Sequence, residues 1–406
     1  MNKIVLKKGR DESLKRFHPW VFSGAVDKVE GQPVEGEVVE VVDSQGNFIA
    51  YGHCQVGTIV VRVLSFDQEY LPEDGEDGSY FEQDFWVDRL SRAINMRSAL
   101  NIASEQTTAY RLVHGEGDSL PGLIVDLYGK VAVMQAHSAG MFLARKEIAK
   151  ALRTCLGDKL DAVYDKSEGT APFKAELELS DGYILGDATG ENVVLENGKK
   201  FRVNWEKGQK TGFFLDQRDN RSLVETYSSG KKVLNLFCYT GGFSIYALAG
   251  GAKKVVSVDS SRVAIEMLEK NVAENGYDLN AEVEHKSICG DAMEYMNNLE
   301  KDEFDLIIVD PPAFAKHRGS LKNALRAYTK LNANAIEKVA KGGIVFTYSC
   351  SQVVDSKSFA LAVFSAAARV GRKVKILHRL TQPADHPVNI YHPEGEYLKG
   401  LVLYVE

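Results

Sequence analysis

The sequence has no apolar run of about eighteen residues, the length that a membrane-spanning helix needs, and no charged-then-apolar leader. We therefore expect no membrane span and no secretory signal, and predict a cytoplasmic protein without a membrane partner. Its 406 residues are too many for one ordinary hydrophobic core, so two or three domains are expected. A hydrophobic fraction of 44% beside 26% charged residues is typical of a globular chain.

Cysteine is scarce, and no two cysteines are spaced as a Cys-x-x-Cys pair. The five are Cys54, Cys155, Cys238, Cys289 and Cys350. An odd number spread over the whole chain indicates reduced thiols and predicts no zinc site or other metal site. Any one of these thiols is then available as a nucleophile.

The chain also lacks an excess of positive charge. Its formal net charge of −7 argues mildly against a nucleic-acid partner, because such partners usually need a basic surface. The charge is unevenly spread, since residues 3–16 contain six Lys and Arg and residues 311–335 contain no acidic residue. The basic residues of the second run are Lys316, Arg318, Lys322, Arg326 and Lys330. This run forms either a solvated face or a surface that meets phosphates.

The pattern of apolar residues changes along the chain and predicts three domains. Residues 1–70 alternate apolar and polar positions in short bursts, which is typical of a small β-rich module. An acidic, glycine-containing segment at 72–79 is a linker, and a unit over 71–190 then begins with a helix at 85–100. That unit continues with a hairpin at 123–134, a helix at 142–156 and a strand near 162–164. Strands and helices alternate through the third domain, 191–406.

Four apolar runs in the third domain predict a parallel sheet. They cover residues 233–237, 254–258, 304–309 and 343–347, with little alternation. Strands that are buried on both faces belong to a parallel sheet covered by helices, so the fold class is α/β. Right-handed crossovers place the loops after these strands along one edge of the sheet. We therefore expect residues 238–242, Asp259, Asp291, 310–314 and 349–351 to converge there.

The segment from Val233 to Asp259 reads as strand, glycine turn, helix and second strand, which is a nucleoside-binding unit. Gly241 and Gly242 let the backbone approach a ligand, and Asp259 is placed to accept hydrogen bonds from two ribose hydroxyls. Dinucleotide folds need Gly-x-Gly-x-x-Gly to hold a pyrophosphate, and no such triplet opens this helix. A phosphate-free adenosine fits better, so we predict S-adenosylmethionine as the cofactor.

A proline-rich loop, Asp310-Pro311-Pro312-Ala313-Phe314, follows the third apolar run. The two prolines stiffen the loop and prevent it from continuing the sheet. In the functional interpretation, Asp310 or a nearby carbonyl hydrogen-bonds the edge of a nucleobase while Phe314 stacks or packs beside it. The alternative is a plain turn that ends a strand.

Cys350 follows the fourth apolar run and has hydroxyls on both sides, at Ser349 and Ser351. A thiol at this edge can attack carbon 6 of a pyrimidine and so make carbon 5 nucleophilic toward a methyl sulfonium. A free thiol titrates near 8.5, so the site should supply positive potential or a hydrogen bond. The alternative is a small buried apolar residue, and for Cys238, in the cofactor loop, packing is the favoured interpretation.

Several further residues allow two interpretations. Asp291 either meets the adenine amino group or caps the helix at 292–299. In one interpretation Asp216 and Arg218 lie in a lid over the cofactor and pair with each other or with the methionine carboxylate. In the other they begin a helix. The aromatic and basic segment 16–22 suits looped or single-stranded RNA, with Trp20 and Phe22 in the core. His114, Glu116 and Asp118 form a metal site or, by the favoured interpretation, a tight hairpin loop.

Taken together, long motifs in this order resemble the PUA-domain large-subunit ribosomal RNA cytosine-5 methyltransferases, which use S-adenosylmethionine. The resemblance covers nearly the whole chain. The motifs are His18-Pro-Trp-Val-Phe-Ser-Gly, Arg111-Leu-Val-His-Gly-Glu-Gly-Asp-Ser-Leu-Pro-Gly-Leu-Ile-Val-Asp, Lys210-Thr-Gly-Phe-Phe-Leu-Asp-Gln-Arg, Asn235-Leu-Phe-Cys-Tyr-Thr-Gly, Asp310-Pro-Pro-Ala-Phe, Tyr348-Ser-Cys-Ser, Asp385-His-Pro-Val and Glu396-Tyr-Leu-Lys-Gly. It implies an N-terminal PUA domain, a central α+β domain with a hairpin, and a C-terminal Rossmann-like methyltransferase domain.

The resemblance implies methylation of carbon 5 of a cytosine in 23S ribosomal RNA, with Cys350 as nucleophile and Asp310 holding the base. The candidate cofactor-binding residues are Phe213, Leu215, Asp216, Arg218, Asn235, Phe237, Tyr239, Thr240, Gly241, Asp259, Ser260, Asp291, Ala292 and Asp310. The candidate substrate-binding residues are Pro311, Pro312, Phe314, Lys316 and Arg318. Related enzymes often keep a second cysteine where this chain has Asp-Pro-Pro, so another base or water must release the adduct. Homodimers are common among such enzymes, although no feature of the sequence requires one.

Two other functions stay open at this point. The same fold can methylate a nitrogen of a purine in ribosomal RNA, in which case Cys350 only packs. A non-catalytic RNA-binding or assembly factor could also retain the cofactor fold. A small-molecule methyltransferase is disfavoured because it would have little use for the N-terminal module.

Overall fold

The structure is a computed structural model that describes residues 1–68, 81–172, 177–188, 190–278, 284–315 and 317–406. Contacts divide the chain into two compact units. The first contains Met1–Val194, Val203–Phe213 and Ala384–Gly395, and the second contains Leu195–Arg202, Phe214–Pro383 and Glu396–Glu406. None of the helices in the described segments is both long enough and apolar enough to cross a membrane.

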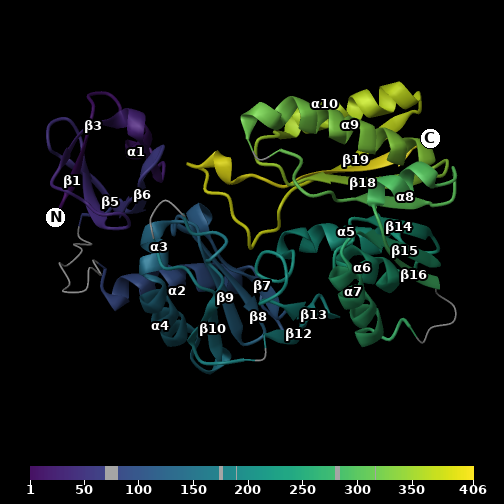
Figure 1. Ribbon diagram of the computed structural model, residues 1–406, viewed down its shortest axis with the longest axis horizontal. Coiled ribbons are helices and arrows are strands. Elements are labelled where there is room, and N and C mark those ends of the chain that lie inside the picture. The colour runs from purple at the N-terminus through teal and green to yellow at the C-terminus, as the bar shows by residue number, and fades with distance from the viewer. Residues whose placement is uncertain (69–80, 173–176, 189, 279–283, 316) are drawn as a thin grey trace. The chain divides into compact units, whose positions relative to one another are not determined.

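The first unit begins with a six-stranded sheet in the order β2-β6-β5-β4-β1-β3, drawn in purple in Figure 1. Its elements are β1 (Lys3–Leu6), α1 (Glu12–Lys15), β2 (Trp20–Phe22), β3 (Val26–Glu30), β4 (Val38–Val42), β5 (Phe48–Cys54) and β6 (Ile59–Ser65). All neighbouring pairs are antiparallel except β1 and β4. The alternating sequence of residues 1–68 thus forms the expected β-rich module, with Leu6, Val39 and Val61 among its core residues.

One prediction for this module is wrong, because Phe22 is not in the core. Its side chain is 40% exposed, whereas Val21 beside it is buried. The strand that contains both, β2, lies at the edge of the sheet and pairs only with β6. Successive side chains of a strand point to opposite faces, so Val21 faces the core and Phe22 does not. Trp20 is half-buried and donates its indole N–H to Glu116 Oε1 at 2.8 Å.

A five-stranded sheet with helices follows in the first unit, in the order β11-β10-β9-β8-β7. Its elements are α2 (Gln83–Ala99), β7 (Ala109–His114), β8 (Leu123–Tyr128), β9 (Val131–Ala136), α3 (Ala139–Leu143), α4 (Arg145–Leu156), β10 (Ala162–Asp165) and β11 (Gly182–Leu185). The predicted hairpin is β8 and β9, while the single helix predicted at 142–156 is two helices that meet at Ala144. The predicted linker at 72–79 lies outside the described residues.

The segment Ala384–Gly395 belongs to the first unit, although it comes late in the sequence. Buried Arg97 holds it, because the guanidinium donates to the carbonyl of Asp385 at 2.7 Å and pairs with Asp118. The Asp385 carboxylate in turn accepts the backbone N–H of Arg111 at 2.9 Å. Buried charges need such partners, so this late segment completes the core of the first unit.

The second unit is built on a seven-stranded sheet in the order β16-β15-β14-β17-β18-β20-β19. Its strands are β14 (Lys232–Leu236), β15 (Lys254–Asp259), β16 (Glu284–Cys289), β17 (Leu306–Val309), β18 (Gly343–Ser349), β19 (Val374–Leu380) and β20 (Lys399–Val405). The first five strands in this order are parallel to one another, and β20 runs antiparallel between β18 and β19. The four predicted apolar runs therefore lie in one parallel sheet, and the α/β class is confirmed.

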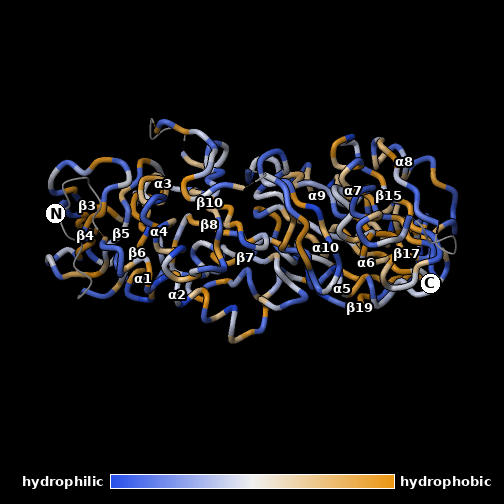
Figure 2. The backbone as a smooth tube through the Cα atoms, turned by 90° about the horizontal axis from the view of Figure 1, so that it is seen from below, coloured by the Kyte–Doolittle hydropathy of each residue, from blue (hydrophilic) through white to orange (hydrophobic). Residues whose placement is uncertain are grey.

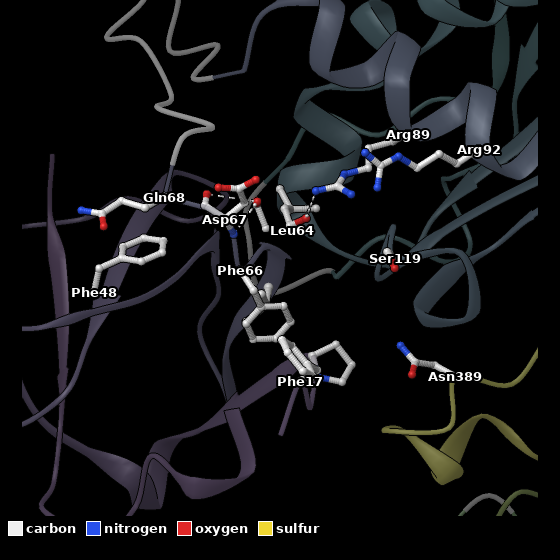
Figure 3. Close-up of a pocket in the computed structure, with 13 residues that line it drawn as sticks. Phe17, Phe48, Leu64, Phe66, Asp67, Gln68, Arg89, Arg92, Ser119 and Asn389 are labelled. Atoms are coloured by element: carbon white, nitrogen blue, oxygen red, sulfur yellow. Dashed lines mark hydrogen bonds between the residues drawn. The ribbon is translucent and has the colours of Figure 1, made fainter. Parts of the chain in front are cut away.

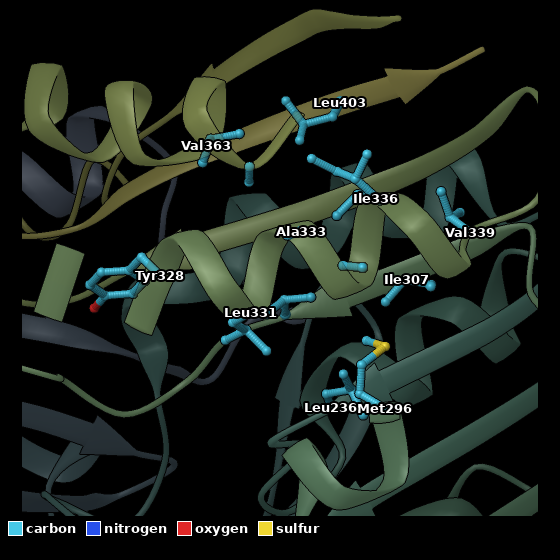
Figure 4. Close-up of a cluster of buried hydrophobic side chains, with 14 of the residues drawn as sticks. Leu236, Met296, Ile307, Tyr328, Leu331, Ala333, Ile336, Val339, Val363 and Leu403 are labelled. Atoms are coloured by element: carbon cyan, nitrogen blue, oxygen red, sulfur yellow. The ribbon is translucent and has the colours of Figure 1, made fainter. Parts of the chain in front are cut away.

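Helices cover both faces of this sheet, as Figure 1 shows. They are α5 (Arg218–Tyr227), α6 (Gly242–Ala249), α7 (Arg262–Glu274), α8 (Ala292–Asn298), α9 (Leu321–Lys338) and α10 (Ser356–Val370). Helix α9 packs Leu331 and Ile336 against a cluster that contains Leu236, Ile307 and Leu403 (Figure 4). Figure 2 shows hydrophobic residues concentrated along β15 and β17. Because the central strands are buried on both faces, residues that could meet a ligand are expected mainly in the loops at the strand ends.

A short hairpin of β12 (Glu191–Glu196) and β13 (Lys199–Asn204) precedes the large sheet. Its Glu196 is fully buried and pairs with Arg221 of α5 through two hydrogen bonds of 2.7 Å each. The hydroxyl of Tyr246 in α6 also donates to Glu196, at 3.1 Å. This buried ion pair therefore connects the hairpin with two helices of the second unit.

We predict that Glu196→Ala destabilises the second unit by about 3–5 kcal/mol, because it leaves the Arg221 charge buried without its carboxylate. Urea denaturation followed by circular dichroism measures this change. The matched control is Glu337→Ala, which removes an exposed pair with Lys301 at 2.8 Å and should cost about 1 kcal/mol at most. Equal effects of the two substitutions would contradict the prediction.

Candidate active site at the carboxyl edge of the large sheet

The loop after β14 has a tightly turned backbone. Phe237, Tyr239 and Gly241 all have positive φ angles, of 57°, 47° and 86°. A side chain at Gly241 would also place its Cβ 2.7 Å from Leu268, so glycine is needed there. Gly241 caps the amino end of α6. The turn thus brings backbone N–H groups of this loop to the carboxyl edge of the sheet, beside the end of β15.

Asp259 ends β15 and is half-buried. Its Oδ2 accepts the N–H of Tyr239 at 2.9 Å, and its Oδ1 accepts the N–H of Ser261 at 2.9 Å. A carboxylate offers about four lone-pair positions, so each oxygen keeps one for a further donor. The carboxylate is therefore held in a fixed position with capacity for two hydroxyl groups.

The next strand, β16, ends one residue before Gly290, whose N–H donates to the carbonyl of Asp259 at 2.9 Å. Asp291 is exposed and caps α8, since its Oδ1 accepts the N–H of Glu294 at 2.8 Å. The capping interpretation of Asp291 is thus present in the structure. Contact with an adenine stays a prediction, as do the roles of Ser260, exposed, and Ala292, buried.

The segment before α5 is buried and connected to the same edge. Tyr397 donates its hydroxyl to Asp216 Oδ2 at 2.8 Å, and Phe214 packs edge-on against Tyr239 with 5.1 Å between ring centroids. Arg218 is buried at the first position of α5, so the predicted helix start is correct. Leu215 is buried in the same segment, and Phe213 is buried within the first unit. A lid over a cofactor stays a prediction.

Asp310 follows β17 and is positioned by two amides of the second unit. The side-chain amide of Gln217 donates to Asp310 Oδ2 at 3.0 Å, and Asn220 donates to the Gln217 oxygen at 2.6 Å. Gln217 and Asn220 are both buried. The sequence did not single out these amides, although both lie in the polar segment that precedes β14. The chain thus fixes the orientation of the Asp310 carboxylate.

Cys350 lies directly after β18 and is half-buried. Its Sγ is 4.0 Å from the carbonyl oxygen of Pro311, so the loops after β17 and β18 meet as predicted. The hydroxyls on either side of Cys350 face inward: Ser349 Oγ donates to the buried Tyr328 hydroxyl at 2.9 Å, and Ser351 Oγ lies 3.2 Å from it. Tyr328 therefore holds the backbone on both sides of the thiol.

Cys238 differs from Cys350 in its surroundings. It is 5% exposed, and burial raises the pKa of its thiol well above the usual value, with the Asp259 charge adding to the effect. A thiol in that environment stays protonated at neutral pH. These observations support the packing role predicted for Cys238.

The candidate substrate-binding residues differ in exposure. Pro311 is buried, Pro312 and Arg318 are exposed, and Phe314 packs against Tyr328 with 4.7 Å between ring centroids. Lys316 lies outside the described residues. On α9, Lys322, Arg326 and Lys330 are all exposed at intervals of four residues and so lie along one face of the helix.

Lys399, at the start of β20, is a residue that sequence reasoning missed. Its side chain is 4% exposed, and its ammonium donates to the carbonyls of Ser351 at 2.7 Å and Tyr397 at 2.6 Å. The only available signal was its place in the motif Glu396-Tyr-Leu-Lys-Gly, which does not indicate which loop the lysine would contact.

The first unit has its own candidate interface, a cavity of about 640 Å³ (Figure 3). Phe17 is 49% exposed there and packs edge-on against Phe66, with 5.3 Å between ring centroids. Arg89 and Arg92 of α2 also line the cavity. Aromatic and cationic side chains are thus combined near residues 16–22, as expected for an RNA surface, although RNA binding itself stays a prediction.

Two of the residues considered for a metal site, Glu116 and Asp118, are engaged in ion pairs. Glu116 pairs with Arg62 at 2.8 Å, and Asp118 pairs with Arg97 and accepts the N–H of His114. A different group in the first unit, His18, His392 and Glu394, brings its ligand atoms within 4.8 Å of one another. The His18 Nδ1 already contacts the backbone of Trp20 at 3.2 Å. The expectation of no metal stays a prediction.

The chain is similar to proteins of known family. Residues 178–399 match a model of S-adenosylmethionine-dependent methyltransferases, and residues 4–66 match a PUA-like domain. A relative from Aeromonas salmonicida, named Ribosomal RNA large subunit methyltransferase I, is 42% identical over 403 residues, covering 98% of each chain. A relative from Escherichia coli with the same name is 39% identical over 406 residues, covering 99% of each chain.

The chain belongs to the S-adenosylmethionine-dependent methyltransferases. Within them it is a member of the family of these two relatives. Solved structures agree on the fold: a methyltransferase from Streptococcus mutans is 23% identical with a TM-score of 0.81, and one in complex with S-adenosylhomocysteine is 24% identical with a TM-score of 0.82. Each pair of chains is covered over its whole length. The predicted fold, cofactor and enzyme class are confirmed.

The residues of this methyltransferase at the sheet edge fit its cofactor. A ribose offers two hydroxyls to a carboxylate, and Asp259 keeps one lone-pair position on each oxygen for them. The turn after β14 has the close backbone approach that a nucleoside needs, without a glycine triplet for phosphates. When bound, S-adenosylmethionine supplies an electrophilic methyl group on a sulfonium.

We predict that Asp259→Ala weakens the binding of S-adenosylhomocysteine by this methyltransferase at least about tenfold, because hydrogen bonds to a charged acceptor contribute about 1.5–3 kcal/mol. Isothermal titration calorimetry measures the affinity. Glu284→Gln is the control. Glu284 is the first residue of the neighbouring strand β16 and so lies at the amino edge of the sheet, away from Asp259, and its substitution should leave binding unchanged. Unchanged affinity in Asp259→Ala would rule out the ribose contact.

Proposed function

We propose that this methyltransferase transfers a methyl group to carbon 5 of a cytosine in 23S ribosomal RNA through a covalent adduct with Cys350. The observation that carries the proposal is the half-buried Cys350 thiol at the carboxyl end of β18, in contact with the loop that carries Asp310. Relatives that match the chain over nearly its whole length are named for methylation of large-subunit ribosomal RNA.

The need for a thiol follows from the chemistry of the base. Carbon 5 of cytosine is a poor nucleophile while the ring is aromatic. When the Cys350 thiolate attacks carbon 6, an S–C bond forms and the electrons of the carbon 5–carbon 6 double bond shift to carbon 5, which can then accept the methyl group. Loss of the carbon 5 proton restores the double bond and expels the Cys350 thiolate. The net products are 5-methylcytosine, S-adenosylhomocysteine and one proton.

In this proposal Asp310 holds the cytosine. Its carboxylate is an acceptor for the exocyclic amino group, and Gln217 and Asn220 fix its direction before the base arrives. Pro311 and Pro312 limit the movement of the loop. Such preorganisation matters because attack requires the reacting atoms to lie about 3–3.5 Å apart.

Access to the cytosine requires RNA binding, because the base must leave its stack. Extrusion of a base costs a few kcal/mol, and less at a loop or bulge. The exposed face of α9 with Lys322, Arg326 and Lys330 is suited to phosphates, and the Phe17 cavity of the first unit is suited to unstacked bases.

A cytoplasmic location fits this substrate, and a homodimer stays an expectation.

We predict that Cys350→Ala abolishes methyl transfer from labelled S-adenosylmethionine to ribosomal RNA from a strain that lacks this gene, while S-adenosylhomocysteine binding changes little. Mass spectrometry of the nucleosides identifies the product, and bisulfite resistance locates the cytosine. Cys238→Ala and Cys289→Ala serve as matched thiol controls and should remain active. Full activity of Cys350→Ala, or an N-methylated purine as the product, would refute the nucleophile and favour the N-methylation alternative.

We also predict that replacing Lys322, Arg326 and Lys330 together by Ala weakens RNA binding and makes it less sensitive to salt. Each lost phosphate contact should lower the slope of log K against log salt by about 0.7 to 0.9. Filter binding over a series of salt concentrations measures the slope. Lys270→Ala, at an exposed position of α7, is the control. An unchanged slope in the triple variant would show that α9 is a solvated face.

A further inference from the structure

The antiparallel pairing of β20 with β18 places a buried ammonium next to the Cys350 loop. Lys399 is the register partner of Ser349, one residue before Cys350. Its Nζ donates to the carbonyl of Ser351, one residue after Cys350, at 2.7 Å, and to the carbonyl of Tyr397 at 2.6 Å. Lys399 is therefore paired with the residue before Cys350 through the strand register, and its ammonium contacts the residue after Cys350. The carbonyls of Ser351 and Tyr397 hold the ammonium in place.

This ammonium has an unusual set of partners. Lysine is rarely this buried without a paired carboxylate, because an uncompensated charge is costly to remove from water. Lys399 is 4% exposed, and its two hydrogen-bond acceptors are neutral carbonyls. Among the residues that the structure describes, no carboxylate lies within ion-pair distance of it. A nearby anion would therefore stabilise it considerably.

The charged and titratable groups around Lys399 are few. Burial lowers its pKa to about 8. Among the groups that oppose this lowering, a negative charge on Cys350 has the largest effect, followed by the charges of Glu396 and of Asp355, which caps α10. From α9, Tyr328 faces the same loop, and burial raises the pKa of its phenol, so it stays neutral. From the loop after β17 comes the carbonyl of Pro311, 4.0 Å from Cys350 Sγ. Lys399 is thus a cation at neutral pH, and Cys350 is its leading charge partner.

We infer that Lys399 is a positioning residue that supplies the positive charge favouring the thiolate of Cys350 and fixes the backbone on the far side of that thiol. The consequence of this pairing for catalysis rests on the proposed function. A lysine next to a cysteine is a known means of raising the thiolate fraction at neutral pH. The thiol proton passes to solvent, Lys399 keeps its own proton, and the thiolate that is later expelled from the adduct returns to the same ammonium.

The first test measures the thiolate without any substrate. Alkylation of Cys350 by iodoacetamide is followed across pH by mass spectrometry of its peptide, with Cys289 of the same unit as an internal control. We expect the wild-type Cys350 profile to have a midpoint below the free-thiol value of about 8.5. Lys399→Met should alkylate about tenfold more slowly at pH 7, and Lys399→Arg should resemble the wild type.

Two results would overturn the inference. One is a wild-type alkylation profile of Cys350 whose midpoint lies at or above that of a free thiol. This measurement uses the wild-type protein alone, so it remains decisive even if Lys399→Met fails to fold. The other is identical alkylation profiles for wild type and a Lys399→Met protein that still binds S-adenosylhomocysteine. A merely structural lysine predicts such identical profiles.

The second test uses activity and separates this inference from the proposed function. The pH at which methyl transfer reaches half of its maximum should be higher in Lys399→Met than in the wild type, because the Cys350 thiol loses its proton at higher pH without the ammonium. Lys399→Arg should keep the wild-type value because arginine stays charged. Equal half-maximum pH values for the wild type and an active Lys399→Met protein would contradict the charge role. If Cys350→Ala is active but alkylation depends on Lys399, the proposed function fails while the pairing of Lys399 with Cys350 stands.

Discussion

The parallel arrangement of β14 to β18 is the constraint on which the rest of the second unit depends. Strands β14, β15, β17 and β18 are buried on both faces, so most of their side chains pack in the core. Groups that could meet a ligand therefore gather in the loops where the strands end. Because the strands run in the same direction, Tyr239, Asp259, Asp310 and Cys350 all reach one edge of the sheet. The candidate cofactor residues and the thiol share this edge as a result.

Much of this edge could be predicted from the sequence. Asp259 and Asp310 follow an apolar run directly and Cys350 comes three residues after one, and right-handed crossovers leave little freedom in where such residues lie. The glycine pattern after β14 also indicated an adenosine without phosphates. Both inferences depend on local sequence and on a general rule of topology, which is why they needed no knowledge of side-chain contacts.

The residues that the sequence did not reveal act over long separations. Lys399 contacts the carbonyl of Ser351 only because β20 inserts antiparallel between β18 and β19, and no local pattern indicates that insertion. Arg97 and Asp385 are 288 positions apart and meet within the first unit. Phe22 was assigned wrongly for a related reason, since an apolar residue in a short strand does not show whether the strand lies at an edge. Such contacts are set by tertiary packing and not by periodicity.

The position of β20 has a consequence for the order in which the protein is made. This strand follows both β18 and β19 in the sequence, yet it lies between them in the sheet. During synthesis β18 and β19 therefore cannot take their final places until β20 has emerged, and Cys350 has no lysine beside it before then. The surroundings of the thiol are thus assembled only after the strand that precedes the thiol and the two strands that follow it have all been made.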